Sequence, residues 1–478
     1  MEPLSPSLNL LDHLNILDWI VFGLVLLATF AAVIWGQIKK NREIPTNDEE
    51  LNFLDLLLMG RRLTLPMFVA TLVATWYGGI FGVTQIAFEQ GIYNFVTQGL
   101  FWYLAYIVFA LFLVHKIAPY HAVTLPDLVD KMFGPRSAKV AAMFNFFNVL
   151  PVAYVISLGL FLQSLFGWSM NLSMIIGVAI VISYSLSGGF RAVVFSDIVQ
   201  FSVMVSSVLL VAILSVSTFG FDTLTTNLPA GHFHPMGENS LSTTLVWGFI
   251  ALSTLVDPNF YQRCFAAESE SAARRGILIS TGIWFLFDIC TTMGGMYARA
   301  TIPEANSGQA YLIYGLQILP PGLRGFFLGG ILATILSTLD SYLFQAGTNL
   351  AFDLAPKKWK GKISIHHFGI IGVGLLSIIL ANVFDGNIKR VWKTLGSYSA
   401  ACLLLPVMIG HLFPKRISDS QFVLACAVGV IGTTYWRNAS HMGFWADVDE
   451  LYIGMLCTAI VLVPTLGKKI QENPSNNS

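Results

Sequence analysis

The sequence predicts an all-α membrane protein with about 13 transmembrane helices, ten of which form a five-plus-five inverted repeat. Three observations support this prediction. Of the 478 residues, 55% are hydrophobic and 11% are charged, whereas a soluble chain carries roughly 25% charged residues. The apolar residues gather into segments that are long enough to span a bilayer. Two of these segments are interrupted by Gly or Pro, and the interruptions lie five helices apart.

Short polar connections separate the expected spans. A helix needs roughly 20 residues to cross the hydrocarbon core, so the shorter segments must stand upright or be broken. In chain order the expected spans cover about 15–37, 63–88, 95–115, 139–166, 171–187, 192–218, 241–262, 273–298, 323–352, 365–384, 390–412, 418–436 and 448–466.

The distribution of Lys and Arg predicts the orientation, because cytoplasmic loops carry the excess of basic residues. With the N-terminus outside, 21 of the 27 Lys and Arg residues lie on the cytoplasmic side and 6 lie outside. The N-terminus has acids and no basic stretch, which indicates a retained anchor and not a cleaved signal peptide. We expect a multi-pass protein of the plasma (inner) membrane, with the N-terminus outside and the C-terminus in the cytoplasm.

Two spans, 63–88 and 241–262, contain helix-breaking residues. The first holds three glycines between Gly78 and Gly82, and the second holds Pro258. Glycine lowers helix propensity and proline removes a backbone hydrogen bond. Such residues also serve ordinary packing in membrane helices. Breaks at corresponding positions of two repeats, however, are typical of transporter binding sites.

The same pattern predicts a division of the chain into four parts. Residues 1–62 hold the first span and a cytoplasmic linker, and residues 63–218 form the first repeat. Residues 219–412 form the second repeat, and residues 413–478 hold two C-terminal helices and a cytoplasmic tail.

The strongest local signal is a stripe of hydroxyl side chains in the ninth span. Its members stand at i, i+3, i+4 and i+7 and share one helix face, with Asp340 at the edge: Thr334, Ser337, Thr338 and Ser341. A single hydroxyl in such a helix usually bonds to a backbone carbonyl or joins two helices. Four aligned hydroxyls beside a carboxylate instead offer the oxygen ligands of a hard cation.

A second signal is an acid inside the sixth span. Asp197 lies six residues beyond Arg191, which is roughly 9 Å along a helix. Asp197 either pairs with Arg191 near the inner surface or serves as an ion ligand or proton carrier.

Aromatic and amide side chains gather beside the first interruption. Trp76 and Tyr77 adjoin it, Gln85 follows on the same span, and Trp102 lies on the next. Aromatic walls with a few amides suit a small polar organic ligand, although interfacial belts and ordinary packing use the same residues.

Several classes of function find no support in the sequence. It contains no Walker, Rossmann, zinc-protease or nucleophile-elbow motif, so we expect no enzyme. The five cysteines are scattered through apolar segments without a C-x-x-C pair, which gives no sign of a disulfide framework or a zinc site. We also expect no nucleic-acid partner. The formal net charge of zero says little about partners, because the charges lie in two separate aqueous layers.

Four motifs resemble those of the sodium:solute symporter family, which includes proline, sugar and choline transporters. They are ATWYGG (Ala74–Gly79), SGGFRAVVFSDIVQ (Ser187–Gln200), FYQRCFAA (Phe260–Ala267) and ILATILSTLDS (Ile331–Ser341), in the family's order. The resemblance runs from about residue 50 to 465. It implies a leucine-transporter-type core with one extra helix before it and two after it, and sodium-coupled uptake by alternating access.

The resemblance also implies where sodium binds. The ligands would be main-chain oxygens at the first interruption and groups of the hydroxyl stripe: the carbonyls of Ala74, Tyr77 and Thr334 and the hydroxyls of Ser337 and Thr338.

Some members of the family hold a further sodium near an acid of the fifth core helix. In this chain a further sodium or proton would use Asp197 with Ser337, Asp340 and Ser341. Asp340 departs from the pattern, since such members can have Ser at that position.

The substrate is expected between the two interrupted spans. The predicted contact residues are Trp76, Gly78, Gln85, Trp102, Thr254, Ser397 and Tyr398. Trp76 stands where the proline-transporter pattern has an acid, and Thr254 and Ile250 stand where that pattern has aromatic contacts, which argues against a simple proline pocket. A sugar, an amino acid, a carboxylate and a quaternary amine remain open as substrates.

We therefore expect a sodium-coupled symporter that imports a small polar organic solute, with sodium as the coupling ion and the lipid bilayer as its surroundings. The alternative is a membrane sensor that keeps the transporter fold and reports a ligand without net transport. Solute counterflow in liposomes distinguishes the two.

Overall fold

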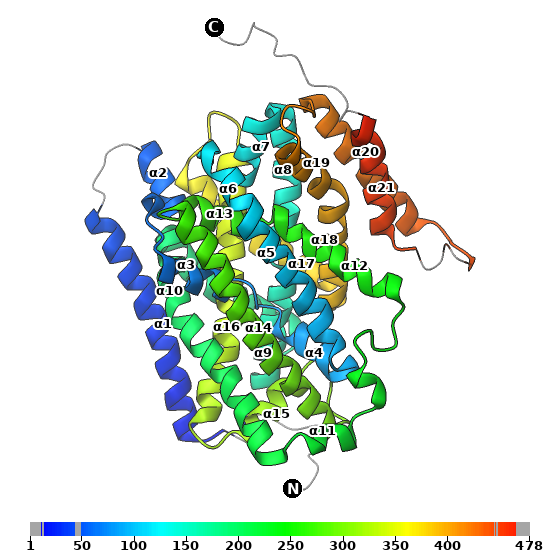
Figure 1. Cartoon of the computed structure of the whole chain (residues 1–478). Helices are drawn as coiled ribbons and strands as arrows, with labels where there is room; N and C mark the ends of the chain where they lie inside the picture. The colour runs from blue at the N-terminus through cyan, green and yellow to red at the C-terminus, as the bar shows by residue number, and fades with distance from the viewer. Residues whose placement is uncertain (1–10, 12–13, 44–48, 444, 446–447, 465–478) are drawn as a thin grey trace, which may run out of the picture.

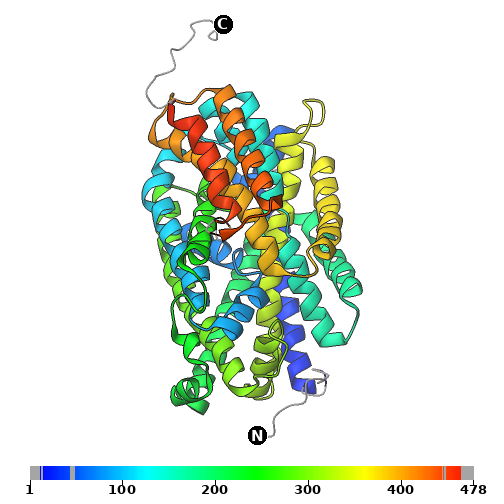
Figure 2. The same cartoon turned by 90° about the vertical axis from the view of Figure 1, so that its right-hand side faces the viewer.

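Helices account for almost all of the described chain, which comprises residues 11, 14–43, 49–443, 445 and 448–464 of the computed structural model. They run between the two ends of an elongated bundle (Figure 1), and the view turned by 90° shows the same arrangement (Figure 2). Within these residues the one β-type contact is an isolated bridge between Leu63 and Ala267. The predicted all-α class is therefore confirmed.

The first half of the chain supplies ten of the labelled helices. They are α1 (Ile16–Glu43), α2 (Glu49–Leu58), α3 (Leu65–Ala74), α4 (Ile80–Gln90), α5 (Phe101–Val108), α6 (Val114–Ile117), α7 (Leu125–Phe133), α8 (Pro135–Asn148), α9 (Val152–Phe166) and α10 (Met170–Phe219). Two π-helical segments, Phe95–Leu100 and Phe109–Leu113, flank α5 and continue the same span. Short 3-10 turns lie at Met59–Arg61 and Ala118–Tyr120.

The second half supplies the remaining labelled helices. They are α11 (Asp222–Asn227), α12 (Leu241–Leu252), α13 (Pro258–Ala266), α14 (Glu270–Thr301), α15 (Ala310–Ile318), α16 (Leu323–Thr348), α17 (Ile363–Val383), α18 (Ile388–Ser399), α19 (Leu405–Leu412), α20 (Asp419–Asn438) and α21 (Glu450–Leu462). Segments Asn349–Leu354 and Ala400–Leu404 are π-helical, and Ala230–Phe233 and Ser253–Val256 are 3-10 turns.

In the described part of the chain, nine helical stretches are long and apolar enough to cross a membrane. Three shorter apolar helices accompany them: Leu65–Ala74, Met170–Leu186 and Glu450–Leu462. Length and composition thus agree with a multi-pass membrane protein, but they do not confirm the expected count of thirteen spans.

Both expected interruptions are present. α3 ends at Ala74 and α4 begins at Ile80, so residues 75–79 are not part of a regular helix. On the other side, the chain after α12 tightens into a 3-10 turn, and Asp257 then caps α13 by accepting a hydrogen bond from the Asn259 backbone N–H at 2.8 Å. Proline follows at the first helical position, where its missing N–H does no harm.

Two kinked stretches of the structure correspond to three of the expected spans. The expected single span 139–166 is divided into α8 and α9, because the connection ends at Pro151, which has no N–H to continue the helix. The expected spans 171–187 and 192–218 form the two halves of α10, which meet at a kink at Gly189. Gly189 has φ 62°, a conformation that glycine adopts without strain.

The bundle is organised around α16, in which every residue from Phe327 to Thr348 is buried. α1, α9, α10 and α17 pack against it. Two glycines permit the close approach: a Cβ at Gly325 would lie 1.9 Å from the Asp18 carbonyl oxygen of α1, and one at Gly330 would lie 2.0 Å from the Ser207 Oγ of α10. Small residues at such crossings are what membrane helices use to pack closely.

Candidate functional site: an oxygen cluster beside a cavity between two helix breaks

The hydroxyl stripe of α16 lies against the end of α3. The Ser337 Oγ is 2.7 Å from the Ala74 carbonyl oxygen and 3.2 Å from that of Thr334. The Thr338 Oγ1 is 3.3 Å and 3.1 Å from the same two oxygens. The last carbonyls of a helix have no intrahelical donor, which leaves Ala74 open to these hydroxyls. These two carbonyl and two hydroxyl oxygens, all on fully buried residues, are called the oxygen cluster below.

The unwound segment after Ala74 connects the oxygen cluster with α14. A Cβ at Gly78 would lie 2.5 Å from the Thr338 Cβ, so the segment passes α16 at a distance that a side chain would block. The Tyr77 side chain points away from α16, donates to Asp288 of α14 and lies 3.2 Å from the Thr291 hydroxyl. The side chain of Tyr77 and the oxygen cluster are thus held by different helices.

Asp197 lies on α10 beside a buried guanidinium that the sequence analysis did not consider. Arg263 of α13 is fully buried, and its Nη2 is 3.9 Å from the Asp197 Oδ2. The same nitrogen donates to the hydroxyls of Thr71 and Ser341 at 3.0 and 3.1 Å. Arg191, the partner considered above, pairs with a carboxylate of α2 at 3.4 Å.

Asp340 makes different hydrogen bonds from this group. Its carboxylate accepts a hydrogen bond from Ser185 of α10, whereas the Ser341 hydroxyl accepts from the Arg263 guanidinium. Adjacent positions on α16 point about 100° apart, which gives the two residues different partners. The two carboxylates still lie near enough for the charge of Asp340 to act on Asp197, and their shared cation site stays a prediction.

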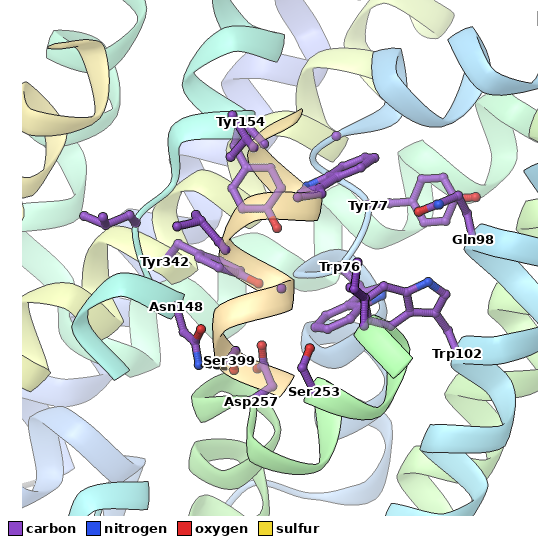
Figure 3. Close-up of a pocket in the computed structure, with 18 of the residues that line it drawn as sticks. Trp76, Tyr77, Gln98, Trp102, Asn148, Tyr154, Ser253, Asp257, Tyr342 and Ser399 are labelled. Carbon is purple, nitrogen blue, oxygen red and sulfur yellow. Dashed lines mark hydrogen bonds between the residues drawn. The ribbon is translucent and has the colours of Figure 1, made fainter. Parts of the chain in front are cut away.

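A cavity of about 140 Å³ lies beside the oxygen cluster, between the two helix breaks (Figure 3). The lining comes from both breaks, from α4, α5, α8, α9, α12, α16 and α18, and from the π-helical segment before α5: Trp76, Tyr77, Gly79, Val83, Gln98, Trp102, Asn148, Leu150, Ala153, Tyr154, Ile250, Ser253, Asp257, Tyr342, Val391, Trp392, Leu395, Gly396 and Ser399.

Aromatic rings and one carboxylate dominate the described lining. The rings of Trp76 and Trp102 meet edge to face at 5.4 Å, and Tyr154 and Tyr342 do so at 4.8 Å. Asp257 is the one charged residue among the lining residues that the structure describes. Figure 3 shows its carboxylate grouped with the hydroxyls of neighbouring serines, facing the aromatic side chains.

Asp257 is held as a helix cap. Its Oδ1 accepts hydrogen bonds from the backbone N–H groups of Asn259 and Phe260, at 2.8 and 3.4 Å. The N-terminus of a helix carries partial positive charge, which stabilises an ionised carboxylate. The break in the second repeat thus presents a negative group to the cavity.

Five of the predicted substrate contacts lie outside the cavity lining. Gly78 lies between two lining residues but does not line the cavity itself. Gln85 donates to a carboxylate one turn further along α4, at 2.8 Å, and the Tyr398 hydroxyl lies 2.9 Å from a threonine of α20. Thr254 and Ser397 are buried beside lining residues but do not line the cavity. At every one of these positions except Gln85 a neighbour in sequence lines the cavity instead, because the sequence does not fix the direction of each side chain.

The cavity also contains residues that the sequence analysis did not select. Asp257, placed directly before Pro258 at the second break, carried a recognisable signal as a capping acid. Tyr342 follows the hydroxyl stripe by one residue, and Trp392 and Tyr154 come from distant spans. Their convergence depends on tertiary packing, for which the sequence gives no local sign.

A model of the sodium:solute symporter family matches residues 56–425. The chain belongs to this family. The resemblance of the four motifs is therefore confirmed, and the protein is a multi-pass membrane transporter of a family whose name describes sodium-coupled solute transport.

Individual relatives are distant. The chain is 24% identical over 352 residues to the high-affinity proline transporter of Bacillus subtilis, with 68% of this chain and 72% of the relative covered. It is 24% identical to the sodium/proline symporter of Escherichia coli over 493 residues, covering 94% and 92%. For the sodium/pantothenate symporter of Escherichia coli the identity is 24%, with 70% and 74% covered.

Solved structures share the fold. A Na+-coupled sialic acid symporter in a substrate-bound, outward-open state matches with a TM-score of 0.75 at 17% identity, covering 95% of this chain and 100% of the other. The leucine-transporter-type core expected for the family is thus confirmed.

The buried pair of Asp197 and Arg263 predicts a strong effect on stability. Asp197→Asn leaves an uncompensated guanidinium in the interior, which costs roughly 3 to 5 kcal/mol. We expect a clearly lower melting temperature in detergent for Asp197→Asn and recovery of most of the loss in Asp197→Asn/Arg263→Gln.

The matched control is the exposed pair of Asp385 and Arg390, 3.0 Å apart. Asp385→Asn should leave the melting temperature nearly unchanged, because exposed pairs contribute little. A double variant that melts no higher than Asp197→Asn contradicts the pairing.

Proposed function

We propose that the protein imports a small organic ammonium compound together with sodium. The observation that carries this proposal is the cavity between the helix breaks, in which the carboxylate of Asp257 faces aromatic rings, directly beside the oxygen cluster. The two features supply one site for the positive nitrogen of a substrate and another for a hard cation.

The oxygen cluster has the composition of a sodium site. A hard monovalent cation requires oxygen ligands. Neutral carbonyls and hydroxyls can replace its hydration shell without binding the ion too tightly for its release. The hydroxyls of Ser337 and Thr338 each lie 2.7 to 3.3 Å from the carbonyl oxygens of Ala74 and Thr334. The carbonyl of Tyr77 would be the fifth ligand. The hydroxyls now donate to the carbonyls, and an entering ion would replace these hydrogen bonds.

The unwound segment links the ion to the substrate. Ala74 contributes a carbonyl to the oxygen cluster, and Trp76, two residues later, forms a wall of the cavity. An ion that holds the Ala74 carbonyl therefore also holds the cavity wall in place. Two ligands that stabilise the same conformation of one segment bind with positive coupling.

The positive charge of the substrate follows from the lining. Among the lining residues that the structure describes, Asp257 carries the one charge. The basic group that acts on it, Arg263, is fully buried, does not line the cavity and also pairs with Asp197. A carboxylate in such a cavity favours a cationic ligand, and Trp76 adds cation–π attraction of roughly 0.5 to 2 kcal/mol. Sugars and carboxylates fit this lining less well.

We propose that a positively charged side chain of the protein replaces the further cation that the sequence analysis expected. The Arg263 guanidinium lies where the hydroxyl of Ser341 and the carboxylate of Asp197 would hold a second ion. One sodium per cycle is therefore the proposed stoichiometry. One charge moving inward through 100 mV supplies about 2.3 kcal/mol, before the concentration gradient of sodium.

The proposed location is the plasma membrane, with the N-terminus outside. The distribution of 21 cytoplasmic and 6 outer basic residues supports this orientation. The proposed orientation also agrees with Figure 1, in which α1 begins at one end of the bundle and α21 ends at the opposite end.

The oxygen cluster predicts how sodium activation responds to mutation. Ser337→Ala and Thr338→Ala each remove one oxygen ligand and leave the apolar packing almost intact, so each should raise the half-saturating sodium concentration of uptake, roughly tenfold for a loss of about 1.4 kcal/mol. The double variant should be worse.

The control is Ser377→Ala on α17, another fully buried serine away from the cluster, which should leave sodium activation as in the wild type. Uptake in proteoliposomes at graded sodium concentrations measures the effect. Normal sodium activation in the double variant would falsify the sodium assignment.

The charge of Asp257 predicts the substrate class. Asn also caps helices well, so Asp257→Asn removes the charge while keeping α13 in place. With choline as the probe, we expect wild-type protein to show a sodium-dependent rise in melting temperature and Asp257→Asn to lose it. The uncharged tert-butyl analogue of choline, which has the same shape, should have little effect on either protein.

Trp76 provides a second test of the same cavity. Trp76→Ala should raise the half-saturating concentration of a cationic substrate far more than that of sodium, and Trp76→Phe should have a milder effect. Equal thermal shifts with choline and its uncharged analogue would argue for a neutral substrate.

A further inference from the structure

One amide of the cavity lining has no partner for its nitrogen. Gln98 lies on the π-helical segment Phe95–Leu100 and lines the cavity that Asp257 also lines. Its Nε2 is buried and has no hydrogen-bond partner in the described chain. By contrast, the other amide among the described lining residues, Asn148, donates to the Ser399 hydroxyl at 3.0 Å. A buried N–H group without an acceptor is rare in native proteins, because it has given up its bond to water without a replacement.

The π-helical backbone positions Gln98 together with one of the aromatic walls. Such segments insert an extra residue into a helix and occur frequently at functional sites. The Trp102 indole N–H donates to the Thr97 carbonyl oxygen at 3.2 Å, and its ring meets that of Trp76 edge to face. Gln98 follows Thr97 directly in the sequence. The backbone that holds the Trp102 ring in the lining therefore also holds the amide there.

The amide of Gln98 can turn its donor to the cavity. A half turn about the last side-chain bond exchanges the oxygen and the nitrogen with almost no change in shape. With the nitrogen buried, the donor stays unpaired, whereas a nitrogen that faces the cavity can donate to a bound molecule. Unpaired N–H groups are rarer in protein interiors than carbonyls without a donor, which favours the second orientation.

Gln98 and Asp257 occupy different ends of the lining. In the view of Figure 3 they lie at opposite sides of the labelled residues, with the rings of Trp76 and Trp102 between them. The proposed function places the positive nitrogen of the substrate near Asp257 and Trp76. A molecule that extends from there along the two rings brings its other end to the Gln98 amide.

A ligand that offers nothing to this amide binds less tightly. Water that enters the cavity can accept from the amide, and a ligand loses affinity when it displaces such water without replacing the hydrogen bond. A buried donor that is left unpaired weakens binding by roughly five- to a hundredfold. The amide therefore selects for a ligand with an acceptor at this end.

We propose that the substrate is an organic ammonium compound that also carries a hydrogen-bond acceptor, and that the Gln98 amide binds this acceptor. The acceptor is an oxygen, such as that of a hydroxyl or a carboxylate, at the end of the molecule away from the nitrogen. This rests on the proposed function in that Asp257 binds the positive nitrogen. Asp257 then distinguishes charged from neutral ligands, and Gln98 distinguishes among ligands of equal charge.

The test compares two ligands that differ in one group, with the purified full-length protein in saturating sodium. Propyltrimethylammonium has the charge and shape of choline, with a methyl group in place of the hydroxyl. From melting temperatures at graded ligand concentrations, we expect choline to bind roughly five- to a hundredfold more tightly than propyltrimethylammonium. Gln98→Leu removes the polar atoms of the side chain and should bring the two affinities to nearly the same value.

The matched control is Gln317→Leu on α15. The Nε2 of Gln317 is also buried without a hydrogen-bond partner in the described chain, but Gln317 does not line the cavity. This variant should keep the wild-type preference for choline. The comparison of the two ligands on the wild-type protein needs no variant, so equal binding of both overturns the proposal even if Gln98→Leu does not fold.

A second pair of ligands tests the direction of the hydrogen bond. The ether oxygen of (2-methoxyethyl)trimethylammonium can only accept, and butyltrimethylammonium is its hydrocarbon counterpart. The ether should bind more tightly than the butyl compound, and Gln98→Leu should remove the difference. A preference for choline without a preference for the ether means that the amide oxygen accepts from the choline hydroxyl, which overturns the proposal.

The failure of this proposal differs from failure of the proposed function. If choline and propyltrimethylammonium bind equally, and both bind more tightly than the uncharged tert-butyl analogue, the role of Gln98 is overturned and the cationic substrate remains supported. If no ammonium compound binds more tightly than the uncharged analogue, the proposed function itself is overturned.

Discussion

The structure depends on one constraint of the bilayer: a carbonyl that leaves a helix there must find another partner. α3 ends inside the membrane-spanning bundle, and the hydroxyls of Ser337 and Thr338 supply that partner to Ala74. The close approach requires a residue without a side chain at Gly78. The hydroxyl stripe and the glycines of the unwound segment therefore meet the same requirement, which is a hydrogen-bond partner for the free carbonyl. α16 is buried along its whole middle because it must face this segment on one side and α1 and α10 on the others.

The interior acids differ in what compensates their charge. Asp197 has the guanidinium of Arg263, and Asp257 has the N-terminus of α13. Asp288 has two phenolic donors, which are neutral. Burial favours the neutral form of each acid, and a counter-charge, a helix N-terminus and hydroxyl donors oppose it to different degrees. The compensation of each acid therefore follows from the elements that pack around it.

The sequence predicted those features that depend on local periodicity and missed those that depend on tertiary packing. The stripe from Thr334 to Ser341 and the two breaks could be recognised because the residues of each feature lie within about ten positions of one another in the sequence. Arg263 could not be assigned to Asp197, since the pair joins helices whose rotation the sequence does not specify. The predicted substrate contact Gln85 lies outside the cavity lining for the same reason. Asp288 is likewise an acid in an otherwise apolar span, but its two tyrosine partners come from other helices and could not be recognised from the sequence.

An unwound segment allows successive residues to serve different sites. In a helix, Ala74, Trp76 and Tyr77 would project in directions fixed by a 3.6-residue period. Here Ala74 turns its carbonyl to α16, Trp76 faces the cavity, and Tyr77 reaches α14. Any movement of the segment must therefore change all three contacts together. The proposed coupling between ion and solute needs no long pathway in this arrangement, because both sites share one short stretch of backbone.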